Sequence, residues 1–207
     1  MKVLLLNGST RLNGCTYTAL KSVADVLEAE GVQTEILQIG AQGVRDCIAC
    51  RKCKETGKCV FCGDIVEEFV EKAKTADGFI IGSPVYYAHP TASVQALLDR
   101  AFYSAGAVFA HKPAAAVLSA RRAGTLSSFD VLNKYFSINQ MPIVTSTYWN
   151  NVHGSAAEEV LRDEEGMQTL RNLARNMAYL LKCIDAAKKQ GIEPPQAERS
   201  SRTNFVR

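Results

Sequence analysis

The sequence predicts an α/β fold, with a doubly wound, five-stranded parallel sheet covered by helices on both faces. Short apolar runs alternate along the chain with segments whose apolar residues recur at helical spacing, which is typical of a parallel sheet. Runs such as VLLL and FII are apolar at every position, as strands buried on both faces are. The ligand of such a sheet lies beyond the carboxyl ends of its strands. The loops at those ends are therefore the candidate site.

Each element follows from a local pattern. Strands are expected at residues 2–6, 33–39, 78–82, 114–118 and 143–146, where the apolar runs fall. A first helix should end at Gly31, and further helices are expected at residues 64–75, 93–103 and 127–136. A long last helix carries an apolar face between Leu170 and Ile184. We expect one domain over residues 1–190 and a polar arm over residues 191–207.

Composition and charge exclude several classes of protein. The 207 residues are 47% hydrophobic and 22% charged, which suits one domain with a real core. The net charge is only +3, and basic residues alternate with acids, so we expect no nucleic-acid partner. No apolar run is long enough to span a membrane, and the N-terminal run is too short for a signal peptide. We therefore expect a cytoplasmic protein without a membrane partner.

The loop after the first strand has the composition of an anion site. Residues 8–16 read GSTRLNGCT, with hydroxyl and amide side chains, two glycines and one arginine before a helix. Helix N-termini and free N–H groups bind phosphate, and Arg11 can pair with phosphate oxygens. The chain lacks GxGxxG and GK[ST], and Lys21 rather than arginine follows Cys15 by six positions. A monophosphate site remains, and a capped loop without a ligand is the alternative.

The loops after the third and fourth strands add aromatic and basic residues. Pro84, Tyr86 and Tyr87 leave the third strand, where a planar ring has room to lie against them. Arg121 and Arg122 leave the fourth strand and suit an electron-rich ring or an anionic reductant. The alternatives are half-buried tyrosines that only pack and a solvated arginine pair. Together, the loops after the first, third and fourth strands are expected to form one crevice.

Five of the seven cysteines fall within residues 47–62. The first four, Cys47, Cys50, Cys53 and Cys59, form a C-x2-C-x2-C-x5-C pattern, and Cys62 follows three residues later. Cytosolic thiols stay reduced, so a metal or redox site is favoured over disulfides. Four close thiolates can ligate an iron–sulfur cluster. Zinc, and free or oxidised thiols, are the alternatives.

These three loops resemble the flavin loops of the flavodoxin-like NAD(P)H-dependent FMN reductases, in order and spacing, over about the first 155 residues. The cysteine pattern, inserted after the second strand, is similar to the [4Fe–4S] motif of the iron–sulfur flavoproteins, a branch of that group. The resemblance implies that the FMN phosphate is bound by Ser9, Arg11, Asn13, Cys15 and Thr16. It implies that the isoalloxazine is flanked by Pro84, Val85, Tyr86 and Tyr87, and that its other edge is contacted by Ser119, Ala120, Arg121, Arg122 and Gly124. It implies that the cluster is ligated by Cys47, Cys50, Cys53 and Cys59.

The function implied is that of an FMN-dependent oxidoreductase. It would pass electrons between a reduced donor, NAD(P)H among the candidates, and a small-molecule or redox-protein acceptor. A [4Fe–4S] cluster would be its second centre, and the resemblance implies a homodimer or homotetramer. No residue stands out as an acid–base catalyst. The alternative is a non-enzymatic electron carrier or redox sensor.

Overall fold

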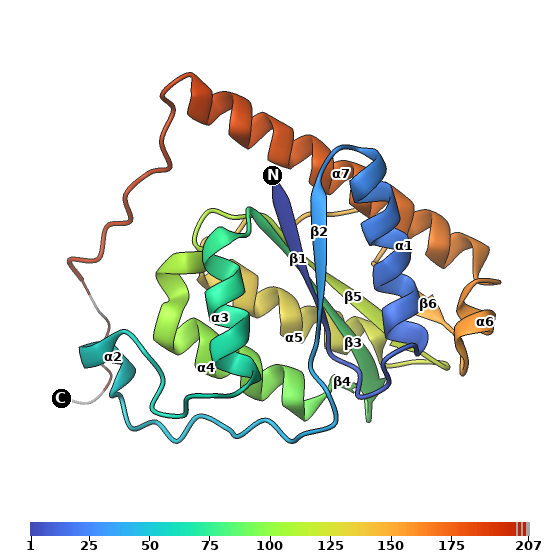
Figure 1. Cartoon of the computed structure of the whole chain (residues 1–207), viewed down its shortest axis with the longest axis horizontal. Helices are drawn as coiled ribbons and strands as arrows, with labels where there is room; N and C mark the ends of the chain where they lie inside the picture. The colour runs from blue at the N-terminus through green and yellow to red at the C-terminus, as the bar shows by residue number, and fades with distance from the viewer. Residues whose placement is uncertain (202, 204, 206–207) are drawn as a thin grey trace.

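A parallel sheet with the strand order β2-β1-β3-β5-β6 forms the centre of the computed structural model, which describes residues 1–201, 203 and 205 (Figure 1). Each neighbouring pair along this order is parallel. A two-residue strand, β4, pairs antiparallel with β3. This is the doubly wound order of the flavodoxin-like folds, so the predicted fold class is confirmed. The strands are β1 Lys2–Asn7, β2 Gln33–Gln38, β3 Gly78–Tyr86, β4 His89–Pro90, β5 Ala114–Ala120 and β6 Asn151–His153.

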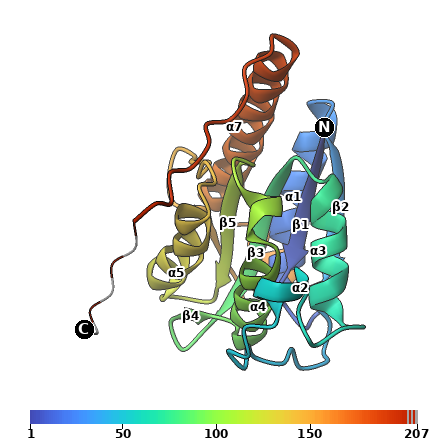
Figure 2. The ribbon, with the colours of Figure 1, turned by 90° about the vertical axis from the view of Figure 1, so that its left-hand side faces the viewer.

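Helices cover both faces of this sheet. In Figure 2, α3, α4 and α5 lie in front of the sheet, and α1 and α7 lie behind it. None of the helices in the described part of the chain is long and apolar enough to cross a membrane. The helices are α1 Cys15–Ala29, α2 Cys53–Thr56, α3 Ile65–Thr75, α4 Ala92–Phe109, α5 Thr125–Ile138, α6 Ala157–Val160 and α7 Glu164–Lys189.

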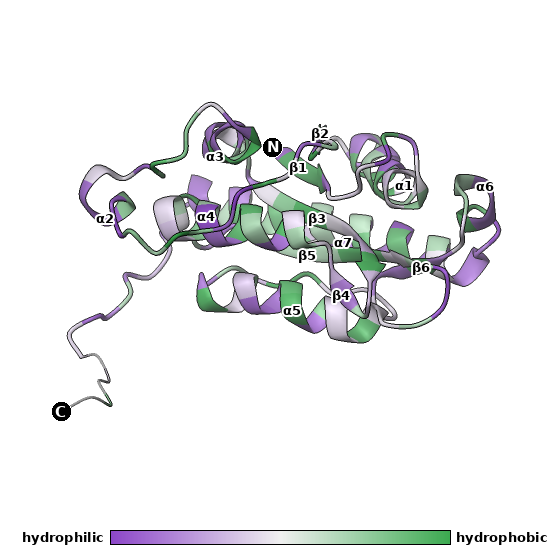
Figure 3. Cartoon of the chain, turned by 90° about the horizontal axis from the view of Figure 1, so that it is seen from below, coloured by the Kyte–Doolittle hydropathy of each residue, from purple (hydrophilic) through white to green (hydrophobic). Residues whose placement is uncertain are grey.

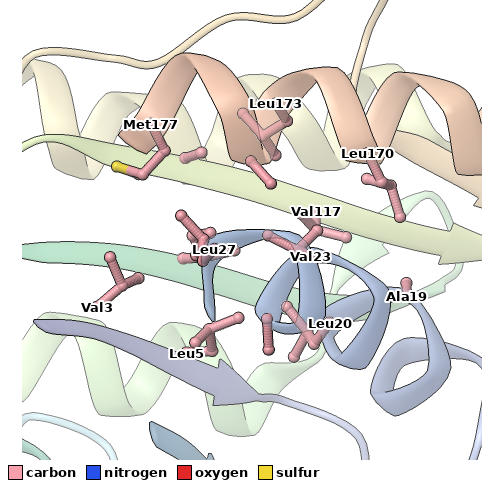
Figure 4. Packing of buried hydrophobic residues seen from close by; sticks show 14 of the residues in the cluster. Val3, Leu5, Ala19, Leu20, Val23, Leu27, Val117, Leu170, Leu173 and Met177 are labelled. Atoms are coloured by element: carbon pink, nitrogen blue, oxygen red, sulfur yellow. The ribbon is translucent and has the colours of Figure 1, made fainter. Parts of the chain in front are cut away.

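Alternate residues of β1 point into the two halves of the core. Val3 and Leu5 pack with α1 and α7 (Figure 4), whereas Leu4 and Leu6 pack with the helices of the other face. All four side chains are fully buried. A strand enclosed on both faces must be apolar at every position, which is why the VLLL run identified it.

Stacked aromatic rings fix α4 against the sheet and its neighbouring helix. The ring centroids of Phe102 and Phe109, both on α4, lie 4.4 Å apart. Phe109 also stacks on Phe69 of α3 at 5.8 Å and contacts Phe79 of β3 at 5.1 Å. Such pairs add to the stabilisation that burial of the rings provides. A kink at Ala105 divides α4, and these rings pack the part around and beyond that kink against α3 and β3.

The last strand lies later in the chain than the sequence predicts. Ile143 makes only a single bridge to Ala114, and pairing with β5 resumes at Asn151. Residues 145 and 146, which lie in between, are hydrogen-bonded to α7 instead. Asn176 Nδ2 donates to Thr145 O at 2.8 Å, and Ser146 Oγ donates to Thr169 O at 2.6 Å. These tertiary hydrogen bonds override the strand preference of the run at 143–146.

The predicted polar arm follows the end of α7. Its described residues form no helix or strand beyond a turn at Gln190 and Gly191. Residues 202, 204, 206 and 207 of the predicted arm lie outside the described residues. The division into a domain and an arm stays a prediction.

Candidate functional site

The first loop lies directly against the middle of β3, at the carboxyl end of β1. Gly8 N–H donates to Gly82 O at 2.8 Å, and Thr91 Oγ1 donates to Gly8 O at 3.2 Å. A Cβ on Gly8 would lie 2.2 Å from Val94 Cγ2, and one on Gly82 would lie 2.7 Å from Leu20 Cδ1. Gly8 cannot be replaced without moving the backbone, because its Cβ would also lie 2.5 Å from Gly82 O, whereas a Cβ on Gly82 would displace side chains of Leu20 and Thr16.

A buried pair of hydroxyls joins this loop to the end of β5. Thr16 Oγ1 and Ser119 Oγ lie 2.8 Å apart, and both residues are almost fully buried. Beside them, the thiol of Cys15 donates to Gly154 O at 3.5 Å. Burial raises the pKa of the Cys15 thiol, so it stays protonated at neutral pH. These contacts position the predicted site residues Cys15, Thr16 and Ser119.

The N-terminus of α1 opens into the first loop without a capping side chain. Its N-cap residue, Gly14, has no side chain to cap the first N–H groups, and the first turn holds no acidic residue. The first N–H groups of a helix have no partner within the helix and carry its positive partial charge. A hollow of about 360 Å³ lies in front of them, with the exposed Arg11 at its border. It is lined by Arg11, Asn13, Gly14, Cys15, Ser155, Ala156, Ala157 and Glu158.

Two amide side chains that the sequence analysis missed support this loop. Asn7 Oδ1 accepts a hydrogen bond from Ser9 N–H at 3.2 Å, and Gln38 Nε2 donates to Ser9 O at 2.5 Å. The Ser9 hydroxyl in turn accepts from Arg11 N–H at 3.1 Å. Asn7 and Gln38 end neighbouring parallel strands. The signal available in the sequence was an amide residue at the carboxyl end of each of these two strands.

The predicted aromatic loop is a tight hairpin between β3 and β4. Its two turn residues, Tyr87 and Ala88, both have positive φ, 48° and 63°, as a type I′ turn requires. This conformation is uncommon for residues other than glycine and asparagine, and such strain gathers at functional sites. Tyr86 is 54% exposed and Tyr87 is fully exposed. Tyr86 is therefore about half exposed, and Tyr87 projects into solvent.

Gly124 braces this hairpin against the start of α5. Its φ is +88°, and a Cβ there would lie 2.7 Å from Ala88 Cα and 2.9 Å from Val85 Cγ1. Ser127 Oγ donates to Ala88 O at 2.6 Å. Arg121 and Arg122, just before Gly124, are exposed. The loops after β3 and β5 are thus in direct contact, as the sequence predicts for one crevice.

The cysteine-rich loop leaves β2 and runs past α4. Figures 1 and 3 place its short helix α2 on the opposite side of α4 from α1 and α6. All seven cysteines lie in the described part of the chain, and each is an unpaired thiol. Four of them border one small hollow of about 30 Å³ beside α4, and Cys62 is not among its lining residues. The four are Cys47, Cys50, Cys53 and Cys59.

These four thiols are spread around the hollow rather than gathered at one point. Within residues 1–201, 203 and 205, no three His, Cys, Asp or Glu side chains group closely enough to hold one metal ion. Ile48, Val60 and Phe61 also line the hollow and make its wall apolar. The arrangement offers soft ligands around an apolar space.

Arg100 of α4 lies beneath this loop, with its side chain fully buried. Nη1 bonds to Asp64 Oδ2 at 2.6 Å, Nη2 donates to Phe61 O at 2.9 Å, and Nε donates to Cys59 Sγ at 3.3 Å. Burial disfavours the charge, but the hydrogen bonds to Asp64 and Cys59 outweigh it and raise the pKa of Arg100. The sequence analysis missed this residue, although an arginine within the apolar stretch ALLDRAF was a signal.

Solved structures share this fold. RosB with a bound 8-demethyl-8-formylriboflavin-5′-phosphate intermediate superposes with a TM-score of 0.69 at 15% identity, covering 100% of this chain and 92% of that one. The apo form of an NADH:FMN oxidoreductase gives 0.64 at 18% identity, covering 86% and 89%. A flavodoxin from the domain Archaea gives 0.59 at 14% identity, covering 88% and 99%. The fold is flavodoxin-like.

Sequence comparison identifies the family. Residues 1–156 match the NADPH-dependent FMN reductase family. An iron–sulfur flavoprotein of Methanocaldococcus jannaschii is 33% identical over 192 residues, which is 89% of this chain and 99% of that protein. One of Methanosarcina thermophila is 28% identical, covering 89% and 97%. The chain belongs to the NADPH-dependent FMN reductase family, in its iron–sulfur flavoprotein branch. It is thus an FMN-dependent oxidoreductase.

The contact between the β3–β4 hairpin and the start of α5 can be tested by mutation. Gly124→Ala should lower the free energy of unfolding by about 1–3 kcal/mol, the range for forcing extra atoms into a filled space. The left-handed backbone adds to this cost. Gly43→Ala is the matched control, because a Cβ there meets nothing within 4 Å. Urea denaturation measures both variants, and equal stability of the two would show that the loops do not touch.

Proposed function

We propose that this protein passes electrons from NAD(P)H through FMN to a small-molecule or protein acceptor, with a [4Fe–4S] cluster as its second centre. The observation that carries the flavin site is the uncapped N-terminus of α1, which opens into a hollow at the carboxyl edge of the sheet. Bound FMN supplies the chemistry, since it can take up a hydride and release single electrons.

The first loop fits the FMN phosphate. Main-chain N–H groups at the start of α1, the side chain of Arg11 and the amide of Asn13 border the hollow and would bind phosphate oxygens. Ser9 and Thr16 are buried, and their hydroxyls already contact Arg11 N–H and Ser119. They would hold the loop in its phosphate-binding shape. Glu158, on the far wall, restricts where the dianion can sit.

The hairpin and the loop after β5 fit the flavin ring. Pro84, Val85, Tyr86 and Tyr87 would flank the isoalloxazine, because both tyrosine rings are exposed next to the carboxyl edge of β3. Ser119, Ala120, Arg121, Arg122 and Gly124 would border its other edge. Among them, the exposed arginines favour the reduced, anionic flavin, and the buried Ser119 fixes the end of β5.

The number and spacing of the cysteines in this loop support an iron–sulfur cluster. A cubane presents separate iron corners to four thiolates, and Cys47, Cys50, Cys53 and Cys59 surround one apolar hollow. Those four residues would be the ligands, and Cys62 would remain free.

This arrangement favours an oligomer. Helix α4 separates the cysteine loop from the first loop and α6 of the same chain (Figure 3). Transfer between the two centres is shorter if the loop of one subunit faces the flavin of another. A homodimer or homotetramer supplies such an approach.

The activity itself is tested by mixing anaerobic protein with NADH or NADPH. A reductase bleaches its flavin absorbance with either nucleotide, because the open ring accepts a hydride. Flavin that dithionite bleaches but neither nucleotide does would contradict the proposed donor and leave an electron carrier or redox sensor.

Arg11 provides a test of the phosphate site. Arg11→Ala should weaken FMN binding by about 1.5–3 kcal/mol, the range for a hydrogen bond to a charged group, which is roughly ten- to 150-fold in Kd. Fluorescence quenching of added FMN measures this. Arg175→Ala, on the exposed side of α7, is the matched control and should bind as the parent does. An unchanged Kd in Arg11→Ala would remove this residue from the site.

Single serine replacements test the ligand set. Anaerobic reconstitution should load about four irons and four sulfides per chain, and replacing any of Cys47, Cys50, Cys53 or Cys59 should lower that content severely. Cys62→Ser is the control and should keep full content, since its thiol does not border the hollow. Iron and sulfide analysis measures each variant. Stoichiometric zinc, or equal loss in Cys62→Ser, would contradict this ligand set.

A further inference from the structure

We propose that Arg100 is a positioning residue that raises the reduction potential of the cluster through its contact with Cys59, an inference that rests on the proposed cluster site. Arg100 Nε donates to Cys59 Sγ at 3.3 Å. Cys59 is one of the four thiols that border the hollow, and Arg100 lines the same hollow. The guanidinium therefore lies against the space that the cluster would fill.

The same guanidinium fixes the loop on which Cys59 lies. Nη2 donates to Phe61 O at 2.9 Å, and Nη1 donates to Arg45 O at 3.4 Å. Its Cζ also lies 5.2 Å from the centre of the Phe61 ring, within the range of a cation–π contact. One side chain of α4 thus contacts both ends of the cysteine loop. These contacts, together with the bond to Asp64, orient the Nε–H toward the sulfur.

Its burial makes this charge matter more than the others nearby. The side chain of Arg100 is 0% exposed, so neither water nor salt screens its field as they screen surface charges. Lys54, in contrast, is exposed on α2. Asp64 offsets part of the Arg100 charge from the far side, with Oδ2 2.6 Å from Nη1.

The direction of the effect follows from charge. One-electron reduction adds one negative charge to a cluster, and much of the charge resides on its sulfur ligands. A hydrogen bond to a ligand sulfur and a buried positive charge both stabilise the reduced form, which raises the potential. Asp64 opposes this effect, so Arg100 and Asp64 shift the potential in opposite directions.

Asp64 can be altered without losing its other role. Its Oδ1 accepts hydrogen bonds from Val66 N–H at 3.1 Å and Glu67 N–H at 3.3 Å, capping α3. Asparagine caps helices about as well as aspartate. Asp64→Asn therefore removes the charge and keeps the cap.

The test is a dithionite titration of the anaerobically reconstituted protein, with the cluster followed by electron paramagnetic resonance. Arg100→Gln should lower the equilibrium constant for one-electron reduction at least tenfold, which is about 59 mV toward more negative potential. Asp64→Asn should shift the potential in the positive direction. Lys54→Gln, the matched exposed charge, should shift it much less than Arg100→Gln does.

The outcomes separate this inference from the proposed function. A parent protein that holds no iron overturns the cluster and this inference together. The inference is wrong, and the cluster stands, if the loaded parent and Arg100→Gln have the same potential. The same holds if Asp64→Asn shifts the potential in the same direction as Arg100→Gln does. If Arg100→Gln fails to load, Asp64→Asn decides: a positive shift supports the role of Arg100, and no shift or a negative one contradicts it.

Discussion

The close approach of the first loop to β3 is the constraint on which the rest of the site depends. Gly8 and Gly82 meet through a 2.8 Å hydrogen bond, and neither position has room for a Cβ. This contact fixes the loop before α1 against the middle of β3. From there Thr16 reaches Ser119 of β5. The carboxyl ends of β1, β3 and β5 are thereby brought together. These contacts are hydrogen bonds, and none of them is a disulfide, a metal bond or a long-range ion pair.

A different interaction holds the inserted loop. Between β2 and α3 the chain forms only one short helix, α2, and such long irregular loops are uncommon without a function. Its main tie to the domain is Arg100, which bonds to Asp64, Phe61 and Cys59. Removing one partner of a buried ion pair is costly because it leaves an uncompensated charge. The same group that secures the loop therefore sets the charge beside the thiols.

The sequence predicted the elements whose pattern is local. Buried strands such as β1 need apolar residues at every position, and the cysteine spacing and the loop glycines are legible without a structure. It misplaced the last strand, because hydrogen bonds from α7, far along the chain, draw residues 145 and 146 out of the sheet. Arg100 was missed for the same reason, since its partners lie 36 to 55 residues earlier.

The far wall of the proposed phosphate site could not be predicted from the sequence either. Residues 155–158 face the first loop only because β6 returns to the edge of β5, where Gly154 N–H donates to Ala120 O at 3.0 Å. Nothing in that stretch carries a phosphate-binding pattern, and Glu158 argues against one. Its place in the site is a consequence of topology.

We expect one chain to hold FMN at the carboxyl edge of its sheet and a cluster in its cysteine loop. An anaerobic crystal structure of the reconstituted protein, with iron located by anomalous scattering, tests this arrangement. We predict FMN phosphate at the N-terminus of α1 and one iron site bounded by Cys47, Cys50, Cys53 and Cys59, with Arg100 against the Cys59 sulfur. Flavin bound elsewhere, or a metal held through Cys62, would contradict the account.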